Sequence, residues 1–291
     1  MEIQWYPGQM AKAKRLLKEN LKLVDAVVEV LDARTPASSR NPDIRDLIAQ
    51  RPVVAVLTHT DLADPQRTKE WLDALQKDYA GVAAVNAMTG EGIRPLLQLL
   101  KSLPAKRKYG GKLRKLLIVG IPNVGKSSLI NRLTGRNAAQ TGNKPGVTRG
   151  KQWVRLPGDL ELLDTPGILW PKIENAGQAF RLAAVGAVKD TIYDPVELGA
   201  ALACYLTAHV PETLPKRYRI NPGEKDPHII LTEIGKRSGC LQRGGAVDLD
   251  AAARLLINDF RAGRLGRITL ETVEKRGENN DYLQQNDAER D

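Results

Sequence analysis

Eight consecutive residues near the middle of the chain match the pattern of a loop that binds nucleotide phosphates. Residues 120–127 read GIPNVGKS, which fits G-x-x-x-x-G-K-[ST]. In such a loop the backbone N–H groups wrap the β-phosphate, Lys126 gives a positive charge to the β- and γ-phosphate oxygens, and the Ser127 hydroxyl binds Mg²⁺. A chance glycine-rich turn is the alternative. The predicted nucleotide contacts of the loop and the following helix are Asn123, Val124, Gly125, Lys126, Ser127 and Ser128.

Two further segments could complete a magnesium and γ-phosphate site. Residues 164–167 read DTPG, in which Asp164 could hold the metal through water and the Gly167 amide could reach the γ-phosphate. Thr148 lies between this segment and the phosphate loop, and its hydroxyl could complete the Mg²⁺ shell. Each segment alone would be an ordinary turn, but their order and spacing after the phosphate loop favour a single site. We therefore count Lys126 and Thr148 as candidate catalytic residues.

A base-recognition motif is missing downstream of Gly167 but has a counterpart upstream. Thr58, His59 and Asp61 follow an expected strand, and Asn86 and Ala87 follow the next one. A carboxylate such as that of Asp61 can accept hydrogen bonds from N1–H and from the exocyclic amine of guanine, two donors that adenine does not present together. The alternative is that Asp61 caps the helix that begins a few residues later.

The elements that must position these residues are those of a parallel sheet covered by helices. Short β-branched runs alternate with helical patterns from residue 24 to residue 103, and more strands surround the phosphate loop. The expected strands are 24–31, 53–57, 82–85, 115–119, 152–156 and 160–163, and the expected helices are 42–49, 66–77, 91–101 and 126–133. The phosphate loop thus follows a strand and precedes a helix, as its motif requires.

The strand signal ends at about residue 173. The remaining periodicity predicts helices at 174–188, 195–208, 226–236 and 248–262, the last capped by Asp248 or Asp250 and stopped by Gly263. Residues 104–112, which are rich in proline, glycine and charge, separate the base motifs from the phosphate loop. We expect an α/β domain over residues 1–175 and an all-helical domain over residues 176–291, ending in an acidic tail that frays.

The charge of the chain favours a polyanionic partner. It carries 44 Lys+Arg against 34 Asp+Glu, a net charge of +10, although such a charge also serves solubility alone. Residues 101–115 hold seven basic and no acidic residues, which suits either a solvated linker or a phosphate-contacting segment. The two cysteines lie far apart, and the sequence has neither an apolar run long enough to span a bilayer nor a signal peptide. We expect a soluble, cytoplasmic protein without membrane contact.

The order of the motifs resembles that of the circularly permuted GTPases. Residues 3–15 (IQWYPGQMAKAKR), 31–36 (LDARTP) and 40–42 (RNP) closely resemble the ribosome biogenesis GTPase A (YlqF/RbgA) family. The resemblance is strong over residues 1–175 and rests on layout alone beyond them. It implies a P-loop, Rossmann-like GTPase domain that binds GTP/GDP and Mg²⁺. It also implies GTP hydrolysis coupled to late assembly of the large ribosomal subunit, with contact to rRNA.

The base motif departs from the family pattern. The family usually has Asn-Lys-x-Asp where residues 58–61 read THTD, and Ser-Ala where Asn86 and Ala87 stand. Asp61 is kept. The flat His59 ring could cover the purine and Thr58 could donate one hydrogen bond, so we predict that guanine preference is retained with weaker affinity.

The resemblance also bears on hydrolysis. Ile168 follows the DTPG segment and cannot orient water as a glutamine there would. The family is thought to use a histidine in a Pro-Gly-His-Met segment, where this chain has Gln9. An amide can position water without acting as a base, so Gln9 is either the catalytic residue for this step or part of a structural turn. Asn123 matches the position that ligates K⁺ in potassium-stimulated GTPases.

Together these features predict a circularly permuted P-loop GTPase domain followed by a helical, RNA-binding domain. The GTP form would bind the large-subunit precursor and rRNA as a monomer, and hydrolysis, slow without the ribosomal subunit, would release it. Because residues 164–167 lie next to the helical domain in the chain, their movement could be passed to its helices. The alternatives are an RNA-binding module that uses nucleotide only as a structural ligand, and a metabolic P-loop kinase, for which no acceptor-binding lid is seen.

Overall fold

The computed structural model describes residues 15–40, 47–48, 51–104, 113–135, 152–164, 173, 175–221 and 223–273. These residues form two compact units. The first contains the described residues up to 173 together with residues 269–273, and the second contains the described residues between 175 and 268. The sequence-based division assigns residues 269–273 to the helical domain, whereas in the structure they return to the first unit.

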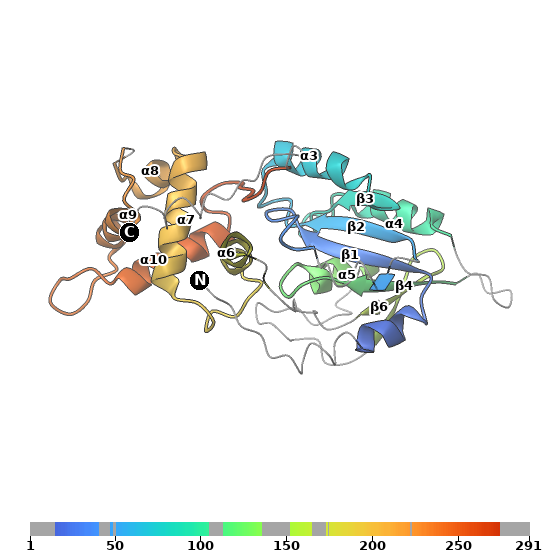
Figure 1. Ribbon diagram of the computed structural model, residues 1–291. Helices are drawn as coiled ribbons and strands as arrows, with labels where there is room; N and C mark the ends of the chain where they lie inside the picture. Colours follow the sequence, from blue (N-terminus) through green and yellow to red (C-terminus); the bar gives the residue numbers. More distant parts are fainter. Residues whose placement is uncertain are drawn as a thin grey trace. The chain divides into compact units, whose positions relative to one another are not determined.

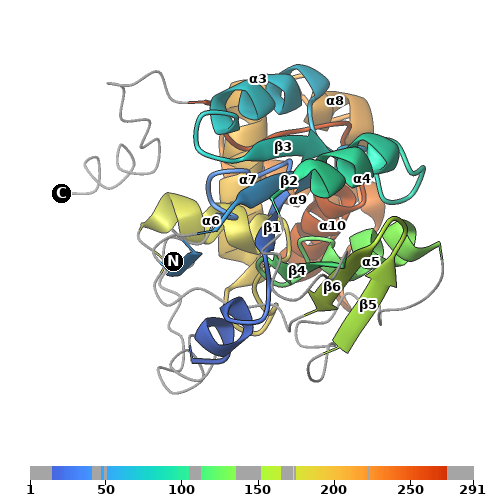
Figure 2. The ribbon, with the colours of Figure 1, turned by 90° about the vertical axis from the view of Figure 1, so that its right-hand side faces the viewer.

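The first unit is built on one six-stranded sheet with strand order β3-β2-β1-β4-β6-β5. The strands are β1 (Ala26–Asp32), β2 (Val53–Thr58), β3 (Gly81–Ala84), β4 (Arg114–Val119), β5 (Gln152–Leu156) and β6 (Leu160–Asp164). All neighbours are parallel except β5 and β6, which lie side by side in Figure 2. Every residue of β1 is buried, as in a parallel strand covered on both faces. The predicted α/β class is confirmed.

The sheet brings the separated motifs to one edge. Strand β4, which leads into the phosphate loop, lies between β1 and β6 near the middle of the sheet (Figure 1). Asp32 at the end of β1 is in register with Thr58 at the end of β2, and Leu117 of β4 is in register with Leu163 of β6. Ligands of such sheets bind at the carboxyl ends of the strands. The permuted order of the motifs therefore still yields one site.

Three helices follow strands β2, β3 and β4 in the chain, in that order: α3 (Pro65–Leu75), α4 (Ile93–Ser102) and α5 (Lys126–Thr134). Helix α3 begins after Asp64, whose carboxylate accepts a hydrogen bond from the Arg67 N–H at 2.8 Å. Pro65 then occupies the first helical position, where its missing N–H costs nothing. Because Asp64 is the cap, the alternative role of Asp61 as a helix cap is removed.

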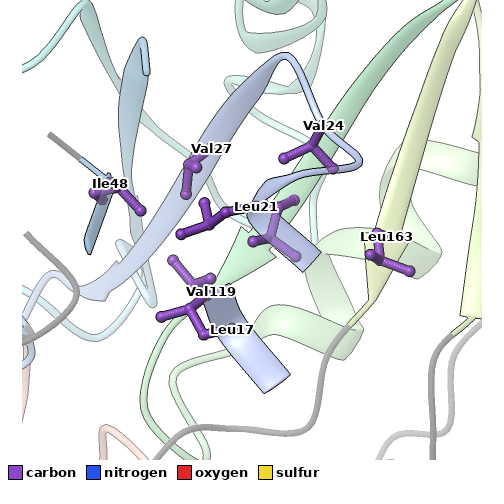
Figure 3. Packing of buried hydrophobic residues seen from close by; sticks show 8 residues of the cluster. Leu17, Leu21, Val24, Val27, Ile48, Val119 and Leu163 are labelled. Carbon is purple, nitrogen blue, oxygen red and sulfur yellow. The ribbon is translucent and has the colours of Figure 1, made fainter. Parts of the chain in front are cut away.

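Residues 15–21 are helical and pack on the sheet (Figure 3). Leu17 and Leu21 are buried in a cluster with strand residues that include Val27 and Val119, while Lys18 is exposed. In the sequence, helical spacing over residues 10–22 predicts one apolar face of Met10, Ala13, Leu17 and Leu21, with Lys18 outside it. The predicted partners Met10 and Ala13 lie outside the described residues.

The secondary structure of the described part of the second unit is helical, and its helices are labelled in Figure 2. They are α6 (Ala176–Ala184), α7 (Pro195–His209), α8 (Thr213–Tyr218), α9 (Pro227–Ser238) and α10 (Leu249–Arg261). Helices α7 and α10 pack so closely that a Cβ on Gly199 would lie 2.7 Å from the Ala253 Cβ. Asp248 caps α10. Among the helices that the structure describes, none has the length and apolar composition needed to cross a bilayer.

Candidate nucleotide-binding site

The phosphate loop joins β4 to α5 and is shaped by its glycines. A Cβ on Gly120 would lie 2.6 Å from the Val30 carbonyl oxygen, so the loop passes β1 at a distance that only glycine allows. Gly125 precedes α5 with a φ of 89°, which also favours glycine. The first N–H groups of α5 lack partners within the helix and can bind an anion. The structure thus has the strand, loop and helix order that the motif requires.

Lys126 folds back over the phosphate loop. Its side chain is 8% exposed, and its Nζ donates to the Gly120 carbonyl at 2.9 Å and to the Ile121 carbonyl at 2.7 Å. Burial lowers the pKa of the Lys126 ammonium to about 8, against the opposing effect of the Asp164 carboxylate. A phosphate in the loop would offer this ammonium stronger acceptors than the two carbonyls.

Two oxygen donors flank the loop at the same edge of the sheet. Asp164 ends β6 and is 2% exposed, and Ser127 lies in the first turn of α5, half-buried, with Ser128 exposed beside it. A carboxylate and a hydroxyl are ligands that Mg²⁺ accepts alongside water and phosphate oxygens. These residues therefore fit the predicted metal. No group of three or more His, Cys, Asp or Glu side chains that could hold a metal occurs in the described part of the chain.

Thr58 contacts the phosphate loop. Its side chain is buried, and its hydroxyl lies 2.5 Å from the Val124 carbonyl oxygen and 3.0 Å from that of Leu31. The single hydroxyl proton is therefore shared between backbone acceptors of the protein. This differs from the expectation that Thr58 donates to the base, and it gives the residue a role in joining β2 to the loop.

His59 contacts Asn123, the residue that precedes Val124 in the phosphate loop. Its Nε2 lies 3.2 Å from the Asn123 carbonyl oxygen. Burial lowers the pKa of His59, while the Asp32 carboxylate acts in the opposite direction. A neutral ring donates from one nitrogen only, and we assign that proton to Nε2 because a carbonyl faces it. The first two residues of the base motif thus both bind the phosphate loop.

The other base-motif residues have different environments. Asp61 is exposed, so its carboxylate is available to a ligand. Asn86 is buried, and its Oδ1 accepts hydrogen bonds from the N–H groups of Met88 at 2.9 Å and Thr89 at 3.1 Å. Asn86 therefore caps the turn that follows β3, and the half-buried Ala87 lies at the start of this turn.

A buried ion pair at the end of β1 is part of this region. The Asp32 carboxylate accepts from Arg34 Nε at 3.0 Å and from an Arg34 terminal nitrogen at 2.7 Å, and both side chains are buried. Although burial acts to raise it, the Arg34 guanidinium holds the pKa of Asp32 below its ordinary value. In the sequence, Asp32 and Arg34 contribute only to the resemblance to the GTPase family. Nothing in their spacing predicts that they form an ion pair.

Three predicted site residues lie outside the described residues: Gln9, Thr148 and Gly167. The described ones converge from both halves of the first unit. Lys126 and Ser127 come from the phosphate loop and α5, Asp164 from β6, and Thr58 and His59 from the end of β2. This is the arrangement of a nucleotide site, with phosphate and metal groups beside a base-recognition segment.

Comparisons with known proteins agree with this geometry. A family model described as "50S ribosome-binding GTPase" matches residues 115–209. The chain is 43% identical over 286 residues to ribosome biogenesis GTPase A of Bacillus cereus, with 96% of each chain covered. It is 33% identical over 272 residues to the protein of the same name from Thermotoga maritima, with 94% of this chain and 95% of that one covered.

Solved structures are similar over nearly the same extent. The crystal structure of GNP-bound YlqF from T. maritima matches with a TM-score of 0.67 and 29% identity, covering 90% of this chain and 98% of that one. The GDP-bound form matches with a TM-score of 0.66 and 27% identity, covering 89% of this chain and 99% of that one.

Proposed function

This chain belongs to the ribosome biogenesis GTPase A family, and from that premise we propose that it assists assembly of the large ribosomal subunit. Membership makes it a GTPase that binds guanine nucleotide and acts in ribosome biogenesis. The finer steps are the proposal: the GTP form binds the large-subunit precursor and rRNA as a monomer, and hydrolysis releases it. The observation that carries it is the phosphate loop with Lys126 at the carboxyl edge of the sheet, within the segment matched by the 50S ribosome-binding model.

Each residue of the site has a part in this proposal. Lys126 exchanges its two carbonyl acceptors for β- and γ-phosphate oxygens. Ser127 and Asp164 hold Mg²⁺, which when bound neutralises phosphate charge. Thr148 completes the metal shell and the Gly167 amide contacts the γ-phosphate. Movement of residues 164–167 on γ-phosphate loss is passed to the helices, because the chain enters α6 at Ala176.

Two roles are carried over from the family pattern and stay proposals. Gln9 orients the attacking water, since Ile168 has no group that could do so. The side chain of Asn123 ligates K⁺ next to the phosphates, a role that comparison of turnover in KCl and in NaCl tests. The alternatives of a purely structural nucleotide and of a metabolic kinase lose their support, because the relatives over nearly the whole chain are GTPases.

The helical unit offers a surface for rRNA. A cavity of about 530 Å³ is lined by Arg217, Tyr218, Arg219, Arg237 and Ser238. Arg217 and Arg264 both pair with the buried Asp259 carboxylate, each at 2.7 Å, so two positive charges face one negative charge there. Arg219 adds further positive charge around the cavity, and so does Arg237, whose Nε lies 3.8 Å from a Glu233 carboxylate oxygen that offsets part of it. A surplus of guanidinium groups around a concave surface suits the phosphates of RNA.

Binding to isolated large ribosomal subunits tests this proposal. Sedimentation with a non-hydrolysable GTP analogue should show binding that is weakened in GDP. The double variant R219Q/R237Q should bind more weakly, with a log–log salt slope smaller by about 0.7 to 0.9 for each lost phosphate contact. The control K189Q/R243Q removes the same charge from exposed positions of the helical unit and should bind as the unmodified protein does. Equal loss in both variants would contradict a specific role of the cavity.

A further inference from the structure

Residues 269–273, here called the strap, are bound to the first unit by backbone and side-chain hydrogen bonds. The Leu270 N–H donates to the Arg34 carbonyl at 2.7 Å, and the Trp71 Nε1–H donates to the Glu271 carbonyl at 3.4 Å. Val273 packs against a buried cluster that includes Leu31, Ala33 and Leu57. The strap thus joins the segment after β1 to helix α3.

Glu271 is the centre of the strap. Its side chain is 7% exposed, and its carboxylate accepts from the Ala37 N–H at 2.6 Å, from the Ser38 N–H at 3.0 Å and from the Ser38 hydroxyl. Hydrogen bonds to a carboxylate are stronger than those between neutral groups. One side chain, more than 230 residues away in the sequence, therefore holds the loop of residues 33–39.

This loop continues into the nucleotide site. Ser39 accepts a hydrogen bond from the Asp32 N–H at 3.1 Å, and the Ala33 N–H donates to the Thr58 carbonyl at 2.9 Å. Thr58 in turn contacts the Val124 carbonyl of the phosphate loop. An unbroken chain of hydrogen bonds and covalent bonds thus runs from Glu271 to the phosphate loop.

The strap also binds the far end of the base-recognition segment. The Asp64 N–H donates to the Thr269 hydroxyl oxygen at 3.1 Å, and that hydroxyl lies 3.3 Å from the Ala33 carbonyl oxygen. The segment from Thr58 to Asp64 is therefore held at its start through the loop of residues 33–39 and at its end directly by Thr269. Asp61 lies between these two anchors.

We propose that Glu271 is a positioning residue for guanine recognition, because it holds the segment that carries Asp61 in its place beside the phosphate loop. The proposal deepens the proposed function and rests on its assignment of Asp61 to the base. Thr58 and His59 bind the phosphate loop rather than bracing the base in the family's usual way. The orientation of Asp61 then depends on the backbone that the strap holds.

The affinity ratio for GDP and IDP tests this role. Hypoxanthine keeps N1–H but lacks the exocyclic amine, so the ratio reports how well Asp61 reaches that amine. Glu271→Ala should weaken GDP binding roughly two- to thirtyfold, the range found for residues that act through a network, and IDP binding less. Glu271→Gln, which keeps an acceptor oxygen, should fall in between. The exposed Glu212→Gln should leave both affinities unchanged.

A second variant distinguishes a loss of base recognition from a folding defect of Glu271→Ala. Thr269→Val removes the hydroxyl that holds Asp64 and should lower the GDP to IDP ratio without removing the carboxylate. Equal weakening of GDP and IDP in both strap variants, or no change in either, would overturn the proposal. Because these affinities are measured without ribosomes, a failure of ribosome binding would not affect the result.

Discussion

Replacing Asp61 with asparagine should transfer the preference of the protein from guanine to xanthine nucleotides. The exposed Asp61 carboxylate is suited to accept from N1–H and the exocyclic amine of guanine. Each hydrogen bond to a charged group contributes about 1.5 to 3 kcal/mol, so loss of the bond to the amine should lower GDP affinity roughly 10- to 150-fold. Xanthine has a carbonyl in place of the amine, and an asparagine amide can donate to that oxygen while still accepting from N1–H.

Titration of GDP and XDP against the unmodified protein and against D61N measures this change of base preference. Asp64→Asn is a matched control, since it makes the same change three residues later and asparagine also caps helices well. The control should keep the original preference. If D61N bound GDP as tightly as the unmodified protein does, the base would have to be recognised by other residues.

The second large effect is expected at Lys126. Lys126→Met should lower GTP turnover by roughly two to three orders of magnitude, as the loss of one preorganised charge donor to a transition state does. The nucleotide-free fold should survive, because burial of the ammonium is unfavourable in that state. The lowered pKa of about 8 against the ordinary 10.5 corresponds to about 3 kcal/mol. This cost is present in full below pH 8 and disappears as the pH rises from 8 to 10.5.

Thermal unfolding without nucleotide and turnover with GTP separate these two effects. Lys126→Arg keeps a positive charge but has a bulkier head group, so it should recover little activity in a loop that closes around Nζ. Unchanged GTP turnover in K126M would show that Lys126 has no role in catalysis. Loss of the fold in K126M would show that its bonds to the Gly120 and Ile121 carbonyls outweigh the cost of burial.

The local parts of the fold are predictable from the sequence. The phosphate loop is a contiguous motif between a strand and a helix, and the capping aspartate of α10 precedes its helix directly. The sequence does not predict helix α8. This helix has six residues, carries Pro215 inside its first turn, and is too short to show a helical period.

The contacts that join distant segments could not be predicted in this way. The bonds of Thr58 and His59 to Val124 and Asn123 cross from one half of the permuted domain to the other. Glu271 follows the helical region and lies near the acidic end of the chain, where the composition predicts only fraying. Its hydrogen bonds to the loop of residues 33–39 depend on the path of the backbone, which no periodicity encodes.

The most direct test of the function is GTP turnover in K⁺ buffer with and without isolated large ribosomal subunits. We predict slow turnover by the protein alone and a clear, saturable increase when large subunits are added, with no increase from small subunits. The same turnover with and without large subunits would contradict a GTPase that acts on this particle.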